Sequence, residues 1–239
     1  MRKSILILFA IFGFLPLKAQ YSDSTFYHLA LTATGSLNET NSSNAYLLNN
    51  GLNFGIKKKD IVLNSTTNWL YGKQNSQLSN NDFSSMLNVN LYKTIPHFYY
   101  WGLINYTTSY SLKVNHQVQA GLGIAYNVID KENFYVNISN GVLYDASNLL
   151  SNANYDTYRN SLRLQYRMMI KDLILFEGSN FIQNSFKSSE DYIIKSTNTL
   201  GIQLKKWISL TTSLNYNRMN ITKSENFNLT YGITLDKYF

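Results

Sequence analysis

The sequence predicts an all-β protein, a transmembrane antiparallel up-and-down β-barrel of about twelve strands. Three observations predict this class. Apolar and small polar residues alternate with a period of two through most of the chain. A short apolar leader comes before the alternating segments, and a strand that ends on Phe239 follows them. The composition combines 19 Tyr and 13 Phe with only 2 Pro and no Cys, which suits many strands with aromatic residues at the membrane interfaces.

Residues 1–19 are predicted to be a signal peptide. Arg2 and Lys3 form a basic start, residues 5–15 are an apolar run, and Leu17-Lys18-Ala19 is a plausible cleavage site. The run is too short to cross a bilayer as a helix, and no later segment approaches the roughly twenty apolar residues that a spanning helix needs. We therefore expect export to the cell outer membrane, with residues 20–239 forming one barrel domain.

Charge and cysteine content exclude several classes of function. Removing Arg2, Lys3 and Lys18 with the leader lowers the formal charge by three, from +7 to +4. That charge is too mild to indicate nucleic acid, and no basic cluster is interleaved with aromatic residues. The absence of Cys excludes disulfides and thiolate metal sites, and three scattered His offer no ligand spacing. No metal or cofactor is expected.

The first six strands are expected at residues 27–37, 46–56, 61–71, 83–91, 98–112 and 117–128. Apolar side chains occupy every second position of the first four, and Asn, Ser and Thr occupy most of the positions between them. The fifth opens with Phe98-Tyr99-Tyr100-Trp101, a cluster that suits a membrane–water interface. Because both of its registers are apolar, the facing of this strand stays open. The sixth is clear, with Val118, Leu122 and Ile124 on one face and Gln117, Gln119 and Gly121 on the other.

The last six strands are expected at residues 134–144, 158–168, 173–184, 192–204, 208–216 and 227–239. The ninth is the least regular. Turns after even-numbered strands are short, whereas connections after odd-numbered strands are expected to be longer loops, at 72–81, 145–156 and 218–226. An even strand count with this alternation is typical of an outer-membrane barrel whose termini lie in the periplasm. The alternative is a soluble β-sandwich or lipocalin-type barrel, but the polar faces are small and offer little to pack a core.

The final strand resembles the C-terminal strand of bacterial outer-membrane β-barrels. The barrel-assembly machinery recognises such strands by a terminal aromatic residue and apolar residues at every second position. Here these residues are Phe239, Leu235, Ile233 and Tyr231, with Lys237 interrupting the row. The resemblance implies this machinery and outer-membrane lipids as partners.

A glycine-rich pattern occupies the middle of the chain. Residues 119–130 include Gly121, Gly123 and Tyr126 and end in an acidic turn, and the next strand contains Gly141 and Tyr144. This pattern resembles the YdiY-like salt-induced outer membrane protein family, a domain of unknown function. In that family the tyrosine directly follows the second glycine, whereas here it follows Gly123 by three positions. The resemblance implies an outer-membrane barrel and no known activity, and it transfers no catalytic residue.

The most distinctive polar feature of the sequence is a row of basic residues, which we call the basic track. Arg159, Arg163 and Arg167 share the face opposite Tyr158 and Leu162, so they are expected to point into the lumen, and Lys195 is expected to join them from a nearby strand. Rows of Arg and Lys select anions in pores, because guanidinium groups donate paired hydrogen bonds to carboxylates and phosphates. The track loosely resembles those of twelve-stranded channels for acidic oligosaccharides.

The alternative interpretation of the track is that its cations pair with inward acids and help to close the lumen. Candidate counter-charges are Glu177 and Asp236. Gly121 and Gly123 are not a phosphate-binding loop, because no helix follows them, and they are expected to let the wall curve or to keep the lumen open.

A lipid hydrolase is the second class of function considered. An outer-membrane phospholipase would need a histidine followed two places later by a nucleophilic serine, but the residue two places after His116 is Val118. His28 and His97 are isolated, and a serine without a base is a weak nucleophile. The prediction is therefore a non-enzyme, a narrow pore for small anionic solutes. The alternative is a hydrolase of lipid A or phospholipid at the extracellular rim.

Overall fold

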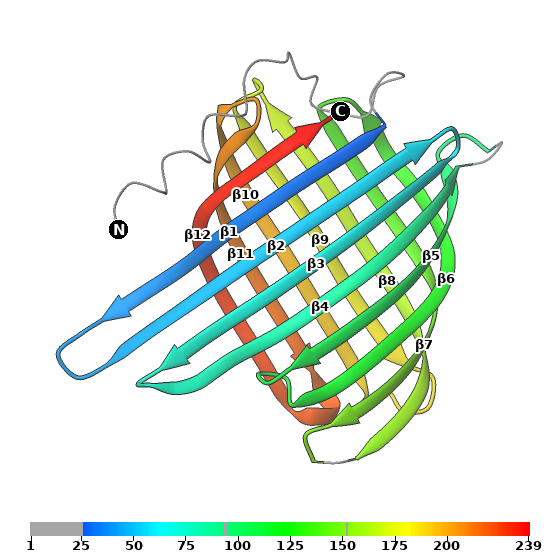
Figure 1. Ribbon diagram of the computed structural model, residues 1–239. Coiled ribbons are helices and arrows are strands. Elements are labelled where there is room, and N and C mark those ends of the chain that lie inside the picture. The colour runs from blue at the N-terminus through cyan, green and yellow to red at the C-terminus, as the bar shows by residue number, and fades with distance from the viewer. Residues whose placement is uncertain (1–25, 93–94, 152) are drawn as a thin grey trace.

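The computed structural model describes residues 26–92, 95–151 and 153–239, which form a closed barrel of antiparallel strands (Figure 1). Each strand pairs with its neighbours in sequence, and β1 pairs with β12. The predicted fold class and strand number are confirmed. The strands are β1 Tyr27–Glu39, β2 Asn44–Lys58, β3 Ile61–Gln74, β4 Gln77–Tyr92, β5 Phe98–Ser109, β6 Val114–Lys131, β7 Phe134–Leu149, β8 Asn154–Ile170, β9 Ile174–Ser185, β10 Tyr192–Lys205, β11 Ile208–Met219 and β12 Ser224–Tyr238, with a 3-10 turn η1 at Asn220–Thr222.

Phe239 takes part in closing the barrel. Tyr27 N donates to Phe239 O at 2.8 Å, Phe239 N donates to Tyr27 O at 3.0 Å, and the two rings stack at 5.8 Å. The pairing of β1 with β12 then continues from His28 opposite Tyr238 to Gly35 opposite Tyr231. This pairing closes the sheet, as a membrane barrel requires, while residues 36–39 of β1 and 224–230 of β12 pair only with β2 and β11.

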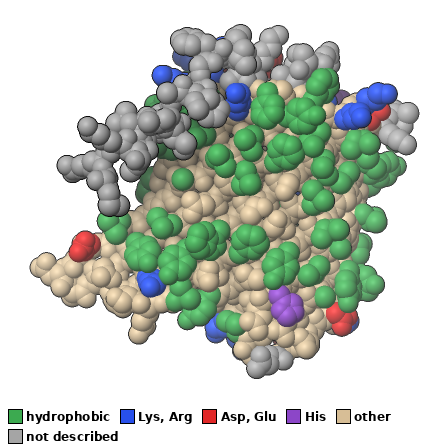
Figure 2. Space-filling model, viewed as in Figure 1, with side chains coloured by type: hydrophobic (Ala, Val, Ile, Leu, Met, Phe, Trp, Pro, Cys, Tyr) green, Lys and Arg blue, Asp and Glu red, His purple; other side chains and the backbone are tan. Residues whose placement is uncertain are grey.

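The outer surface carries the apolar rows that the alternation predicts. Leu31, Leu122, Leu162 and Tyr231 are all exposed on it. Figure 2 shows hydrophobic side chains spread over the visible wall, while the charged side chains lie near its edges. An apolar surface of this extent needs lipid rather than water around it. Among the described residues, no helix is both long and apolar enough to cross a membrane.

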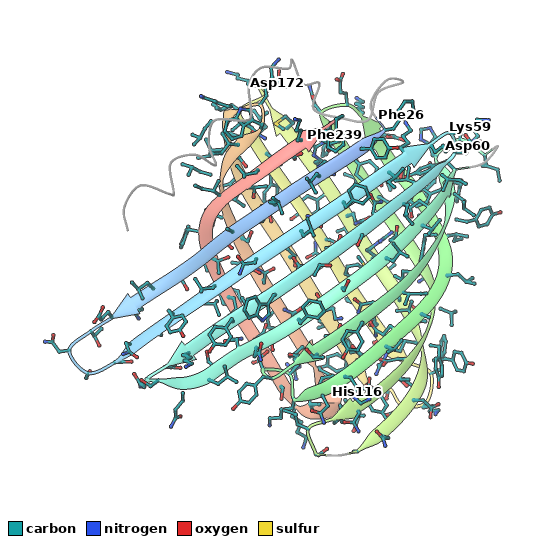
Figure 3. The ribbon with its side chains drawn as sticks, in the orientation of Figure 1. Phe26, Lys59, Asp60, His116, Asp172 and Phe239 are labelled. Atoms are coloured by element: carbon teal, nitrogen blue, oxygen red, sulfur yellow. The ribbon has the colours of Figure 1, made fainter. Side chains whose placement is uncertain are left out.

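The two ends of the barrel differ in what they carry. The terminal end carries Phe26 and Phe239 together with the turns at Lys59, Asp60 and Asp172, whereas His116 lies near the opposite end (Figure 3). That opposite end, the loop end, holds the connections that follow odd-numbered strands. The predicted leader, residues 1–19, lies outside the described residues.

The longer loops predicted at 72–81, 145–156 and 218–226 are wrong. β3 and β4 stay paired as far as Gln74 opposite Gln77, and β7 and β8 as far as Asn148 opposite Asn154. Asn75 and Ser76 both have positive φ, 48° and 65°, the conformation that closes a two-residue hairpin turn. The strands continue because their backbone groups keep hydrogen-bond partners in the neighbouring strand, even where apolar and polar side chains no longer alternate.

The interior holds two apolar clusters. Tyr99, Trp101, Leu103, Ala125 and Leu143 form one on the wall of β5, β6 and β7. The other lies at the loop end and contains Leu112, Val114, Leu149, Ile193 and Met219. The open facing of β5 is thereby settled, since Tyr99 and Trp101 are buried while Phe98 and Tyr100 are exposed. Only half of the predicted interface cluster therefore faces outward.

Two glycines make room for the Trp101 indole. A Cβ at Gly123 would come within 2.6 Å of Trp101 Cζ2, and one at Gly141 within 2.4 Å. The indole Nε1 donates to the carbonyl of Ile124 at 3.2 Å. The expectation that Gly123 keeps the lumen open is therefore wrong, because a large side chain fills the space. Gly121 instead lets β6 lie close to β7, since a Cβ there would come within 2.2 Å of the carbonyl oxygen of Val142.

Candidate functional site in the barrel lumen

Arg159 lies at the centre of a buried ionic network. Its Nε donates to Asp145 Oδ2 at 2.6 Å, and its Nη2 donates to Asp191 Oδ1 at 2.9 Å and to Tyr155 Oη at 2.9 Å. The arginine is 0% exposed. Gln117 Nε2 also donates to both carboxylate oxygens of Asp145, at 3.0 and 2.9 Å. Two acids thus neutralise this cation, which is unavailable to a solute.

Neither of the acids proposed as counter-charges contacts Arg159. Asp236 Oδ1 is 2.9 Å from His28 Nε2, on the β1–β12 seam, and does not pair with an arginine. β12 pairs with β1 and β11 and is separated from β8 by β9, β10 and β11 in the sheet. Glu177 stands directly opposite Arg167 in the pairing of β8 with β9. The alternative interpretation of the track thus holds for Arg159, but with acids other than those expected.

Arg163, Phe181 and Lys195 form a row across three neighbouring strands. Arg163 on β8 pairs in register with Phe181 on β9, and Phe181 pairs with Lys195 on β10. Within the described part of the chain, neither cation has an ion pair with an acid. We call these three residues the lumen row.

Arg163 is held in place by contacts that leave its charge uncompensated. Its Nε donates to Ser139 Oγ at 3.0 Å. The guanidinium carbon lies 5.8 Å from the Trp101 ring centroid and 5.7 Å from that of Phe181, within the range of cation–π attraction. The two aromatic faces orient the guanidinium without neutralising it, so its other nitrogens remain able to bind an anion.

The three histidines lie on different elements: His28 on β1, His97 in the turn before β5 and His116 on β6. His116 is an exposed residue of β6, beside the buried Gln117, so it lies on the outer surface. His28 contacts Asp236 and stacks on Tyr238, and His97 lies in a turn, edge-on to Tyr126. Among the described residues, no hydrogen bond between a histidine and a serine is present, and no cluster of His, Asp and Glu could hold a metal ion.

The structure brings all four predicted cations into the lumen. The sequence reasoning missed Asp145, Asp191, Trp101 and Phe181. Asp145 could have been found, since it continues the inward register of β7 through Asn137, Ser139 and Leu143. Asp191 lies outside the strands, in the 186–191 connection, so alternation carries no signal for its direction. Phe181 is an aromatic residue on the polar face, which is why apolar and polar residues do not alternate regularly along the ninth predicted strand.

Solved structures similar to this chain are membrane barrels. The NanC porin matches with a TM-score of 0.53 and 10% identity over 88% of this chain and 99% of that chain. The translocator domain of the autotransporter NalP from Neisseria meningitidis matches with a TM-score of 0.51 and 10% identity, over 91% and 90%. At such identities the likeness shows the fold alone.

No curated protein matches the chain significantly. A family model described as a protein of unknown function, DUF481, matches residues 31–236, which run from β1 to near the end of β12 and include the whole lumen row. The resemblance to a family of unknown function is thereby confirmed, and the chain belongs to the DUF481 family.

Proposed function

We propose that this protein is a narrow channel of the bacterial outer membrane whose lumen favours small anionic solutes. The observation that carries the proposal is the lumen row, in which Arg163 and Lys195 flank Phe181 without an acid partner in the described chain. The barrel needs a membrane for its apolar exterior, and closed barrels of this kind occur in outer membranes. The terminal end would then face the periplasm and the loop end the outside.

The charge distribution explains why anions would be preferred. Arg159 is neutralised by Asp145 and Asp191, and Arg167 faces Glu177. Arg163 and Lys195 are therefore the cations that act on a solute at the middle of the lumen. Since strands are spaced about 4.8 Å apart, the two backbones that carry them are separated by about 10 Å. A carboxylate or phosphate group fits between two such donors, and a basic lining is how pores select anions.

The similar solved structure described as a porin, NanC, is consistent with a transport role, although its fold alone does not define a solute. The hydrolase alternative finds less support. His116 lies on the outer surface, and among the described residues it has no serine hydrogen-bonded to it. A lipid hydrolase would require a nucleophile activated by a base within hydrogen-bond reach.

The test is the current through purified protein in planar bilayers bathed in KCl. Because Leu112 is packed across the loop end, the wild type and Leu112→Ser are both recorded. We expect unitary currents that decrease when Arg163 and Lys195 are both changed to Gln and remain when Arg218→Gln removes a cation of the loop-end rim. Silent membranes with both wild type and Leu112→Ser overturn the channel. Lipid hydrolysis lost in His116→Ala would favour the enzyme instead.

A further inference from the structure

The connection between β5 and β6, residues 110–113, folds inward over the lumen, and we call it the mouth turn. Leu112 at its tip is 7% exposed and packs with Val114, Leu149, Ile193 and Met219. Ile193 and Met219 belong to β10 and β11, which lie far around the closed barrel from β5. The apolar cluster therefore bridges the loop end from one wall to the other.

A single carboxylate on β4 holds the mouth turn in this position. Asp82 Oδ1 accepts hydrogen bonds from Ser109 Oγ at 2.8 Å and from Ser111 N at 3.0 Å, and Asp82 Oδ2 accepts one from Ser111 Oγ at 2.6 Å. Ser109 Oγ in turn accepts a hydrogen bond from Leu112 N at 3.0 Å. Ser109 and Ser111, which both precede Leu112, are thus bound directly to Asp82. Hydrogen bonds to a charged group are stronger than neutral ones.

The far wall also contacts the mouth turn. Asn226 Nδ2 on β12 donates to Ser111 Oγ at 2.5 Å, and Leu150 N donates to Lys113 O at 2.9 Å. Asn226 reaches the turn from β12, which is not its neighbour in the sheet, whereas Leu150 directly follows β7 and continues the pairing of β6 with β7. Tyr110 N also donates to Asn81 O of β4 at 3.3 Å, so opening the turn breaks one backbone hydrogen bond at the end of each flanking pairing, while the strand pairs of the barrel stay in place.

We propose that the mouth turn is an extracellular gate with Asp82 as its latch, an inference that rests on the proposed channel function. In the structure the gate is closed, with Leu112 seated among the apolar residues of the opposite wall. Opening requires Ser109 and Ser111 to leave Asp82, and Leu112 to leave its cluster. Short connections that move between two packed positions are a common form of gating.

The chain has no Cys, so an engineered disulfide can lock the gate. In Ser111→Cys with Asn226→Cys, oxidation should join the turn to β12. The matched control is Thr67→Cys with Ser85→Cys, whose hydroxyl oxygens lie 3.1 Å apart on the outward faces of β3 and β4. We expect both pairs to cross-link, which a mobility shift in non-reducing gels detects. If only the control pair cross-links, Ser111 of the mouth turn does not lie beside Asn226 of β12. That result would overturn the gate.

Planar-bilayer recordings then separate the gate from the channel. Reduction should increase the open fraction of the Ser111–Asn226 protein and leave that of the control pair unchanged. Asp82→Ala should increase the open fraction about tenfold, equivalent to about 1.4 kcal/mol, which is within the worth of a hydrogen bond to a charged group. If Asp82→Ala fails to fold, Leu112→Ser tests the same opening step, because it weakens the packing of Leu112 in its apolar cluster.

Equal currents before and after reduction would overturn the gate while leaving the channel in place. If no form of the protein carries a current, including the reduced pair and Leu112→Ser, the channel is overturned and the gate with it.

Discussion

Arg159 and Asp145 form an ion pair of 2.6 Å in which neither side chain is exposed. The pair joins β7 to β8 inside the barrel, and Asp191 adds a second carboxylate from the 186–191 connection. Arg159, one of the three arginines of the predicted basic track, is therefore a structural residue. Its charge holds the loop end together, so the proposed anion binding rests on Arg163.

The first prediction concerns this buried pair. Asp145→Ala should lower the free energy of unfolding by about 3–5 kcal/mol, because it leaves the guanidinium of Arg159 buried with half of its counter-charge removed. The control is Asp156→Ala, which removes an exposed partner of Lys187 at 3.1 Å and should cost less than about 1 kcal/mol. Urea titration of the barrel in lipid vesicles measures both. Equal losses would contradict the assignment of Arg159 as a structural residue.

The second prediction concerns the space beneath Trp101. Gly141→Ala should destabilise the barrel by about 1–3 kcal/mol, because its Cβ would overlap the indole and the neighbouring backbone. Gly102→Ala is the matched control, since a Cβ there meets only the carbonyl oxygen of Gly121 at 3.8 Å. The quenching of Trp fluorescence by acrylamide should also rise in Gly141→Ala as the indole loses its site. A tolerated Gly141→Ala with unchanged quenching would show that the indole lies elsewhere.

The third prediction tests the outer surface. Leu122 and Leu37 are similarly exposed, at 72% and 76%, but Leu122 lies in the middle of β6 and Leu37 near the end of β1. In lipid vesicles Leu122→Arg should cost about 2–4 kcal/mol of unfolding free energy, as for a charge near the bilayer midplane. Leu37→Arg should stay within about 0.5 kcal/mol, as for an ordinary surface change. Similar small effects at both positions would contradict a lipid-facing wall.

The fourth prediction concerns assembly. We propose that Phe239 is read by the barrel-assembly machinery in addition to stacking on Tyr27. Phe239→Ala should then lower the amount of folded barrel in cells severalfold, while refolding from urea into detergent micelles changes little. Phe186→Ala removes an exposed aromatic residue at the loop end and serves as the control. An equal defect of Phe239→Ala in cells and in micelles would assign Phe239 to stability alone.

The alternation of side chains was sufficient to predict the barrel, because a period of two directly reports which residues face lipid. It could not predict where strands end. At 72–81 and 145–156 polar residues predominate and the alternation is lost, and only the backbone pairing of the hairpins shows that the strands continue. The sequence also left β5 undecided, since Tyr99 and Tyr100 are equally apolar and the glycines that accept Trp101 belong to β6 and β7.

The candidate site was only partly predictable for a related reason. Period-two spacing predicted Arg159, Arg163, Arg167 and Lys195 on inward faces, and Arg159 and Arg163 are buried. Which acid meets which cation depends on register and on contacts that cross the barrel. Asp145 and Asp191 meet Arg159 through the pairing of β7 with β8 and the path of the 186–191 connection. These contacts neutralise Arg159, whereas Arg163 has no ion pair with an acid among the described residues.

The most direct test of the central claim is the reversal potential of the open channel in a KCl gradient of about tenfold across a planar bilayer. If Arg163 and Lys195 make the lumen electropositive, the potential has the sign of chloride preference. Changing both residues to Gln should move it toward zero, while Arg218→Gln leaves it unchanged. A potential with the sign of potassium preference, or one that the double variant leaves unmoved, would contradict the account.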